Sequence, residues 1–410
     1  MISPSRAASP RASLQGLDGL NFFIANVQTG FGPFISVYLT ANAWPQVDIG
    51  LVLTISGVVS LVGLFPAGVL VDAIAAKRSV AAIAILAIAG TALALAARPV
   101  FPLVLLAEVL HGIASCLLGP AIAAITIGLV EQHLISARFG RNASFASVGN
   151  AIAAALMGAC GRLFSDRAVF VLTAALAIPA LLALYRIRAR DIDAARARGG
   201  LPPAGDNAAP ARLVDILKNR NLLIFSLCLA LFHLGNAAML PLAGSVVTMH
   251  SNQWATVLIA ACIVVPQIVV AAFSPWVGRK AQQWGRRPLL VLGFAALPIR
   301  GVLFAAIVSP WLLVGVQVLD GISAAVIGVL LPIVVSDLTR RSGHFNAALS
   351  TAGTAAGVGA SISPSLAGYV TDSVGYGAAF LLLAGIAALG LAVLWRALPE
   401  TRPPAPIADS

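Results

Sequence analysis

The sequence has little charge and few cysteines. Asp, Glu, Lys and Arg make up only 10% of its 410 residues, whereas soluble globular chains carry roughly a quarter. This scarcity excludes an ordinary water-soluble domain. The four cysteines form no CxxC pair and show no metal-ligand spacing, which excludes a zinc site. The chain also has no phosphate-binding loop and no nucleophile–base pairing, so we expect neither an enzyme nor a cofactor.

Long apolar runs take the place of charge. Hydrophobic residues make up 59% of the chain, and the mean hydropathy is +0.95. The apolar runs are about 20 residues long, enough to cross ~30 Å of hydrocarbon as helices. We therefore predict an all-α polytopic membrane protein with twelve transmembrane helices. The predicted spans lie near 17–40, 47–72, 79–97, 101–130, 142–164, 168–186, 221–249, 254–277, 288–308, 311–337, 345–370 and 376–397.

The net charge of +11 follows the predicted topology. All but four of the 26 Lys and Arg lie on one side, at the two termini and in the loops that join even-numbered spans to the next span. The positive-inside rule then places both termini in the cytoplasm, in a bacterial inner membrane. The charge therefore indicates orientation, and we expect a monomer with the lipid bilayer, not a nucleic acid, as its partner.

A duplication divides the chain. Glu108-Val-Leu-His-Gly-Ile is repeated half a chain later as Gln317-Val-Leu-Asp-Gly-Ile, and Pro33, Gly68 and Asn142 have counterparts at nearly the same offset. Matches in this order predict two tandem six-helix halves of the same topology. The expected organisation is a disordered leader (1–16), an N-terminal bundle (17–186), a cytoplasmic linker (187–220), a C-terminal bundle (221–397) and a cytoplasmic tail (398–410).

Two basic loops carry a family motif. The loop after the second span has a Gly-x-x-x-Asp pattern followed by two basic residues, and the loop after the eighth span repeats it with Gln in place of the acid. These residues are Gly68, Asp72, Lys77 and Arg78 in the first copy, and Gly278, Gln282, Gly285, Arg286 and Arg287 in the second.

With its twelve spans, the chain resembles the major facilitator superfamily over essentially its whole length. The loop motif is closest to the drug/proton antiporter-like group, but the fourth span departs from that group, with Glu108 and His111 where its members often carry Arg and Gln. The resemblance implies two pseudo-symmetric bundles, with spans 1, 4, 7 and 10 around a central cavity. It also implies that the motif residues of both loops form a cytoplasmic gate.

Ionisable residues inside the predicted spans are the candidates for function, because each costs free energy to insert. They are Glu108, His111, His233, Arg300 and Asp320. We predict that Glu108 carries a coupling proton, with His111 and Asp320 in the same pathway; the alternative is a static hydrogen-bonded pair. The expected cavity residues are Asn21, Gln28, Ser115, His233, Asn236, Gln317 and Arg300.

Two contacts are predicted from position alone. Arg300 and Asp320 lie at similar depth on consecutive antiparallel helices, so an ion pair between them would offset the free-energy cost of burying both charges in the membrane. If Arg300 faced the cavity instead, an anionic substrate would be favoured. Asp72, at a helix end, is placed to cap the N-terminus of the eleventh span near His344.

The leading interpretation is a proton-coupled secondary transporter that moves a small organic solute by alternating access. Export is slightly favoured, because of the loop motif; proton-coupled uptake of an organic anion is the alternative. An alternative of another class is a transport-inactive sensor or scaffold on the same fold. The ionisable residues inside the spans argue against the scaffold, which would not need them.

Overall fold

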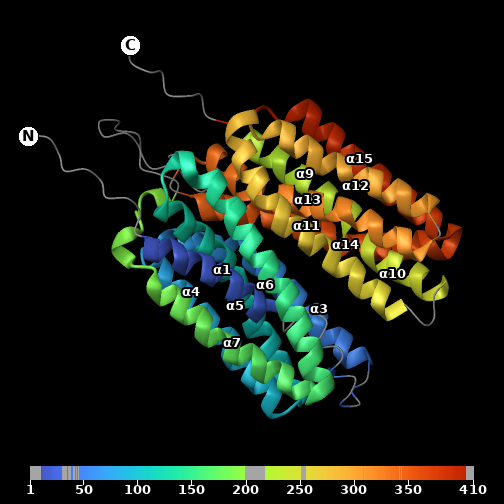
Figure 1. Ribbon diagram of the computed structural model, residues 1–410, viewed down its shortest axis with the longest axis horizontal. Coiled ribbons are helices and arrows are strands. Elements are labelled where there is room, and N and C mark those ends of the chain that lie inside the picture. Colours follow the sequence, from blue (N-terminus) through green and yellow to red (C-terminus); the bar gives the residue numbers. More distant parts are fainter. Residues whose placement is uncertain are drawn as a thin grey trace, which may run out of the picture.

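The computed structural model describes residues 11–29, 35, 38–39, 42, 44, 46–198, 218–250, 255–307, 309–340, 342 and 344–402. These residues form two bundles of long helices, one from each half of the chain (Figure 1). The first bundle contains α1 (Arg11–Thr29), α3 (Gln46–Ala73), α4 (Lys77–Ala97), α5 (Phe101–Leu129), α6 (Ile135–Leu163) and α7 (Asp166–Arg186). The second contains α9 (Arg220–Asn236), α10 (Met239–His250), α11 (Ala255–Trp284), α12 (Arg287–Ala306), α13 (Pro310–Leu338), α14 (Phe345–Val374) and α15 (Tyr376–Ala397).

The described helices correspond to the twelve predicted spans, with α9 and α10 together forming the seventh. Ten spans of the described residues are long and apolar enough to cross a membrane, and α1 and α14 complete the set. The all-helical prediction is confirmed.

The first helix begins earlier than expected, at Arg11, so residues 11–16 of the predicted leader are helical. Ser13 is fully buried; its hydroxyl donates to Asp191 Oδ2 (2.6 Å) and accepts from the backbone N–H of Arg188 (3.1 Å). These bonds hold the start of α1 against the segment that follows α7. Residues 1–10 of the leader lie outside the described residues.

The described part of the linker is folded onto the first bundle. It contains two short 3-10 helices, η2 (Ala189–Asp191) and η3 (Arg196–Arg198). The N–H of Asp193 donates to the carbonyl of Gly128 (2.9 Å), at the end of α5. Residues 199–217 of the linker and 403–410 of the tail lie outside the described residues.

We call one end of the molecule the basic end, because both motif loops, α3–α4 and α11–α12, lie there. The two bundles meet through α6 against α11 and α3 against α14 (Figure 1). In the α6–α11 contact, the hydroxyls of Ser144 and Ser147 donate to the carbonyls of Ala271 (2.6 Å) and Gln267 (2.8 Å). Small polar residues of this kind allow helices to associate within a membrane.

Two glycines let the backbones of α6 and α11 touch near the basic end. A Cβ atom added at Gly278 would lie 2.5 Å from the carbonyl oxygen of Ser136 and 3.1 Å from the Cα of Gly140. Neither neighbour is a flexible side chain, so the helices must separate if Gly278 is replaced. The bundles are therefore closed against each other at the basic end.

The substitution Gly278→Val is expected to shift the protein toward a conformation that is open at the basic end. The added methyl groups have no space while α6 and α11 are in contact. Electron paramagnetic resonance distances between spin labels at the exposed positions Glu131 and Gln283 would measure the separation.

Gly90→Val on α4 is the matched control, because a Cβ there meets nothing within 4 Å. A distance distribution that stayed the same in Gly278→Val would contradict the closed contact.

Candidate functional site

Glu108 is buried where α5 packs against α3. Its side chain is 3% exposed, and its Oε1 has no hydrogen-bond partner among the described residues. One turn further along, Gly112 lies against Ser56 and Ser60 of α3, and the Ser56 hydroxyl donates to the Glu108 carbonyl (3.1 Å). A carboxylate ionised in such a place would lack the partners that normally offset its lost hydration.

His111 and Ser115 form a second polar unit on α5. The His111 Nε2 lies 3.3 Å from the Ser115 Oγ, one helical turn away. Both residues are partly buried, and Gly119, one turn beyond Ser115, is exposed. His111, Ser115 and Gly119 thus lie at successive turns of α5, and Gly119 lines the cavity described below.

Arg300 is the centre of a polar cluster in the second bundle. Its side chain is 1% exposed, and one guanidinium nitrogen donates to Asp320 Oδ1 (2.5 Å) and to Asn236 Oδ1 (2.7 Å). The guanidinium also lies over the Phe304 ring, 5.2 Å from its centroid, where a cation–π attraction adds to the ion pair. The predicted ion pair is confirmed.

A break in the seventh span brings Asn236 to this cluster. Helix α9 ends at Asn236, and α10 begins after a turn at residues 237–238. The N–H of Ala238 is buried and donates to the Ser363 hydroxyl of α14 (3.0 Å), which satisfies a group that the break removes from the helix. The hydropathy predicts one continuous span near 221–249, so the break is a difference between sequence and structure.

The other predicted cavity residues are dispersed. Gln317 is fully buried on α13, and Gln28 is exposed on α1. Asn21 donates to the Leu17 carbonyl of its own helix (2.8 Å). His233 is partly buried, edge-on to the neighbouring Phe232 ring.

The duplication relates the two polar groups. When the two halves are aligned so that Glu108 corresponds to Gln317, His111 corresponds to Asp320. When they are aligned so that Gly68 corresponds to Gly278, Arg300 corresponds to Gly90 of α4. The first bundle therefore has no counterpart of the guanidinium, and its acid, Glu108, lies on a different position from the paired acid of the second bundle.

A cavity of about 380 Å³ lies between the bundles, lined by α1, α3, α5, α6, α13 and α14. Its lining residues are mostly apolar, and none carries a charge. They are Asn21, Leu64, Gly119, Pro120, Ile122, Ala123, Phe139, Asn142, Ala143, Ala146, Gly328, Leu331, Pro332, Leu349, Ser350 and Gly353. Of the residues predicted for the cavity, this lining includes Asn21.

Two polar atoms of this lining have no hydrogen-bond partner among the described residues. They are Asn142 Oδ1 and Ser350 Oγ, both buried. The Asn142 amide nitrogen donates to the Thr126 hydroxyl (2.9 Å), which fixes the orientation of its free oxygen. Both atoms are covered by protein atoms in this conformation, whereas Asn21 is partly exposed, so the described cavity wall is largely apolar.

The cavity and Glu108 lie at different depths. Asn142 and Ser350 are one to two turns from the starts of α6 and α14, at the basic end. Glu108 is about two turns from the start of α5, which lies at the opposite end. The cavity is therefore next to the closed end, and Glu108 is farther from it.

The carboxylate of Asp72 closes the basic end between α3 and α14. One oxygen accepts from the N–H of Asn346 (3.2 Å) and from its side-chain amide (2.6 Å), and the other from the N–H of Ala347 (2.8 Å). These N–H groups belong to the first turn of α14, where a negative charge is favoured. The predicted cap is confirmed. The Lys77 ammonium donates in turn to the carbonyls of Val71 and Asp72.

The second motif loop makes different contacts. Gln282, in the place of Asp72, donates to the Ser136 hydroxyl at the start of α6 (3.1 Å). Arg286 pairs with Asp337 (2.9 Å), and Glu400 accepts from the N–H groups of Arg286 (2.9 Å) and Arg287 (3.0 Å). The two copies of the motif therefore make unequal contacts between the bundles.

A buried charge network that the sequence did not predict joins α1 to α6. Asp18 accepts from Arg138 (2.7 Å) and, at both oxygens, from Arg141 (2.9 and 2.8 Å). Asp18 is 6% exposed and Arg138 is 7% exposed. The sequence carries a signal for this network: an acid within the first span and two arginines three residues apart. From the arginines alone, only the orientation of the chain in the membrane was predicted.

Breaking the Arg300–Asp320 pair on one side is expected to destabilise the protein by about 3–5 kcal/mol. In Asp320→Asn the buried guanidinium loses its counter-charge. The double variant Arg300→Met/Asp320→Leu removes both charges and should lose much less. Thermal unfolding in detergent micelles would compare them.

Asp372→Asn, which changes an exposed carboxylate on α14, serves as the matched control. Equal unfolding temperatures for Asp320→Asn and this control would show that the pair contributes nothing to stability.

Comparisons with known proteins agree with this architecture. The sequence profile of the Major Facilitator Superfamily matches residues 17–297 and 226–409. Two uncharacterised MFS-type transporters of Mycobacterium tuberculosis, from strains CDC 1551 / Oshkosh and H37Rv, are each 39% identical over 408 residues, covering 98% of this chain and 96% of theirs. Multidrug resistance protein 1 of Bacillus subtilis is 28% identical over 198 residues, covering 45% of this chain and 47% of that protein.

Solved structures share the fold at low identity. The human organic anion transporter MFSD10 has a TM-score of 0.69 at 16% identity, covering 94% of this chain and 99% of that chain. The proton:xylose symporter XylE has a TM-score of 0.69 at 15% identity, covering 95% and 96%. The profile match and the full-length relatives show that this chain is not an enzyme but belongs to the major facilitator superfamily of secondary transporters.

Proposed function

We propose that this transporter exports a small, mainly apolar organic solute in exchange for protons. The observation that carries the proposal is the uncharged, largely apolar cavity between the bundles, with the partly exposed Asn21 in its wall. Its volume of about 380 Å³ falls in the range of roughly 300–1,000 Å³ typical of small-molecule sites. Apolar walls with a few convergent polar groups favour a solute of the same character.

The charge distribution supports an uncharged or cationic solute over an organic anion. The described cavity lining includes no Arg, Lys or His. Arg300, the cation that would have favoured an anion, is buried and bound to Asp320 and Asn236. An anion entering this cavity would lose its hydration without gaining a positive partner.

The closed basic end supports alternating access. Asp72 joins α3 to α14 at the basic end, and the close contact of Gly140 of α6 with Gly278 of α11 brings the two bundles together at the same end. With the basic end in the cytoplasm, as the positive-inside rule requires, this conformation faces outward. Export then requires the hydrogen bonds of Asp72 to break, so that solute can enter from the cytoplasm.

Glu108 is the proposed proton carrier. In this conformation its carboxyl is buried and its Oε1 has no partner, so a proton is needed to avoid an unpaired charge. A rearrangement of α3 against α5 that admits water would allow the proton to leave. Asp320, by contrast, is paired with the Arg300 guanidinium.

The direction of transport is supported by two resemblances. The α3–α4 loop resembles that of the drug/proton antiporter-like group, and the Bacillus subtilis relative bears the name of a multidrug resistance protein. Transport outward against inward proton flow is consistent with both.

Filling the cavity should abolish transport without unfolding the protein. At Gly353, in the cavity wall, an added Cβ meets nothing within 4 Å, so Gly353→Leu occupies the space that a solute would use. We expect binding of fluorescent neutral and cationic dyes to fall at least tenfold, by about 1.4 kcal/mol or more. Gly90→Leu, which fills open space away from this cavity, is the control.

Glu108→Gln should uncouple transport from the proton gradient. In proteoliposomes with an imposed pH gradient, wild-type protein should accumulate dye, and the variant should only exchange dye down its own gradient. Glu131→Gln, which neutralises an exposed carboxylate, should behave as wild type. Accumulation of dye by Glu108→Gln in response to the pH gradient would exclude Glu108 as the proton carrier. Binding of organic anions, with no binding of the neutral and cationic dyes, would contradict the proposed class of solute.

A further inference from the structure

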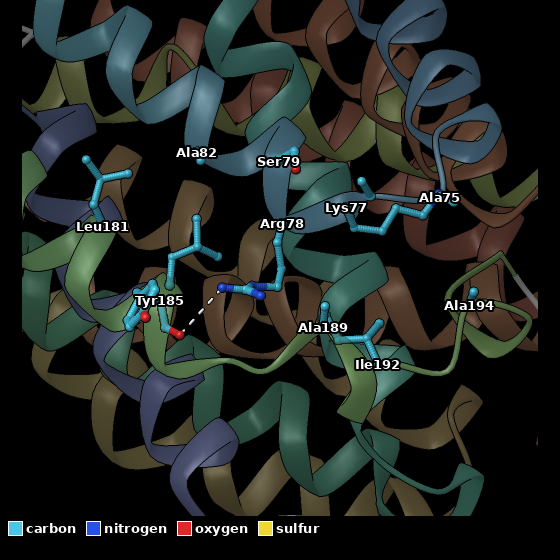
Figure 2. Close-up of a pocket in the computed structure, with 12 residues that line it drawn as sticks. Ala75, Lys77, Arg78, Ser79, Ala82, Leu181, Tyr185, Ala189, Ile192 and Ala194 are labelled. Atoms are coloured by element: carbon cyan, nitrogen blue, oxygen red, sulfur yellow. Dashed lines mark hydrogen bonds between the residues drawn. The ribbon is translucent and has the colours of Figure 1, made fainter.

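A chain of three hollows follows the outside of the first bundle at the basic end. The first, about 530 Å³, lies between the start of α4, the end of α7 and the linker (Figure 2). The second, about 740 Å³, adjoins it and shares Arg78, Tyr185 and Ala189. The third, about 360 Å³, continues between α1 and α7 and shares Gln15, Tyr185 and Arg186 with the second. We call them the head pocket, the arginine trough and the apolar groove.

The head pocket has the features of an anion site. It contains the start of α4, which has no side-chain cap and no acidic residue in its first turn. The N–H groups of Lys77 and Ser79 donate to the carbonyls of Ala75 (3.0 Å) and Ala76 (3.0 Å), so the helix start contributes mainly its partial positive charge. Figure 2 shows Arg78 extending from this helix toward the Tyr185 carbonyl, to which it donates at 3.5 Å. The Nε of Arg78 is buried and has no partner among the described residues.

The arginine trough adds positive charge with little compensation. Arg186, Arg188 and Arg190 line it and are exposed. Within the described chain, Arg186 and Arg188 form no ion pair, and Arg190 lies 4.0 Å from Asp191. Lys77 does not contribute, because it is buried against the end of α3.

The apolar groove favours a lipid over a soluble anion as the ligand of these hollows. It is bounded by Gly16, Gly19 and Phe23 of α1 and by Pro179 and Leu182 of α7. Leu182 is 62% exposed and Tyr185 is 80% exposed, at the end of a membrane-spanning helix. Tyrosine at this position is typical of the membrane–water interface, so the groove faces acyl chains and the trough faces head groups.

We propose that these hollows bind an anionic glycerophospholipid, with its phosphate at Arg78 and the start of α4 and an acyl chain along the apolar groove. Basic pockets between helices at the membrane surface suit such head groups, and each nearby Arg contributes about fivefold to affinity. The bound lipid joins the start of α4 to the end of α7. This site is separate from the transport cavity and does not depend on the solute.

The test is lipid binding by purified protein in detergent, measured by native mass spectrometry. Phosphatidylglycerol should bind to wild type, and phosphatidylcholine should bind at least tenfold more weakly. Arg186→Gln/Arg188→Gln should bind phosphatidylglycerol about thirtyfold more weakly than wild type. Arg340→Gln/Arg396→Gln, which removes two exposed arginines from the second half, should bind it as wild type does.

Two competitors separate the possible ligands. Inorganic phosphate and glycerol phosphate, which lack acyl chains, should fail to displace phosphatidylglycerol at millimolar concentration. Displacement by either would show a site for a soluble anion and overturn the lipid assignment. Equal losses in the two double variants would show general electrostatic attraction to the basic end, with no specific site.

Discussion

The cost of burying an unpaired charge determines where ionisable groups lie in this protein. Asp18, Asp72 and Arg300 are each at least nine-tenths buried, and each is held by charged partners or by N–H groups. The Oε1 of Glu108 has no such partner among the described residues. In a protein surrounded by hydrocarbon, paired charges maintain the structure, and a buried carboxyl without a charged partner is the group whose protonation can change with conformation.

The basic end shows how one charge can hold two bundles together. Asp72 belongs to α3, but all three of its hydrogen bonds come from the first turn of α14. The contact is therefore both a cap of α14 and a link between the two bundles, so breaking these hydrogen bonds removes the cap and the link together. Gln282 contacts α6 with a single neutral hydrogen bond, so the closure is stronger on the Asp72 side.

Position along the helices was sufficient to predict contacts between residues at matching depth. The twelve helices, the Arg300–Asp320 pair and the cap by Asp72 followed from hydropathy, topology and the cost of buried charge. The break before α10 was missed although Gly235 precedes it and Pro241 follows it; Pro241 has no N–H to donate to the carbonyl of Ala237, but the hydropathy of the span is continuous. The cavity could not be predicted either, since its apolar walls resemble any lipid-facing surface until the bundles are placed together.

The divided seventh span has a mechanical consequence. Because α10 is separated from α9 at the level of Asn236, the polar cluster around Arg300 is attached to α9, α12 and α13 and not to α10. A change in the tilt of α10 about residues 237–238 would break neither hydrogen bond of Arg300, because both of its partners lie outside α10.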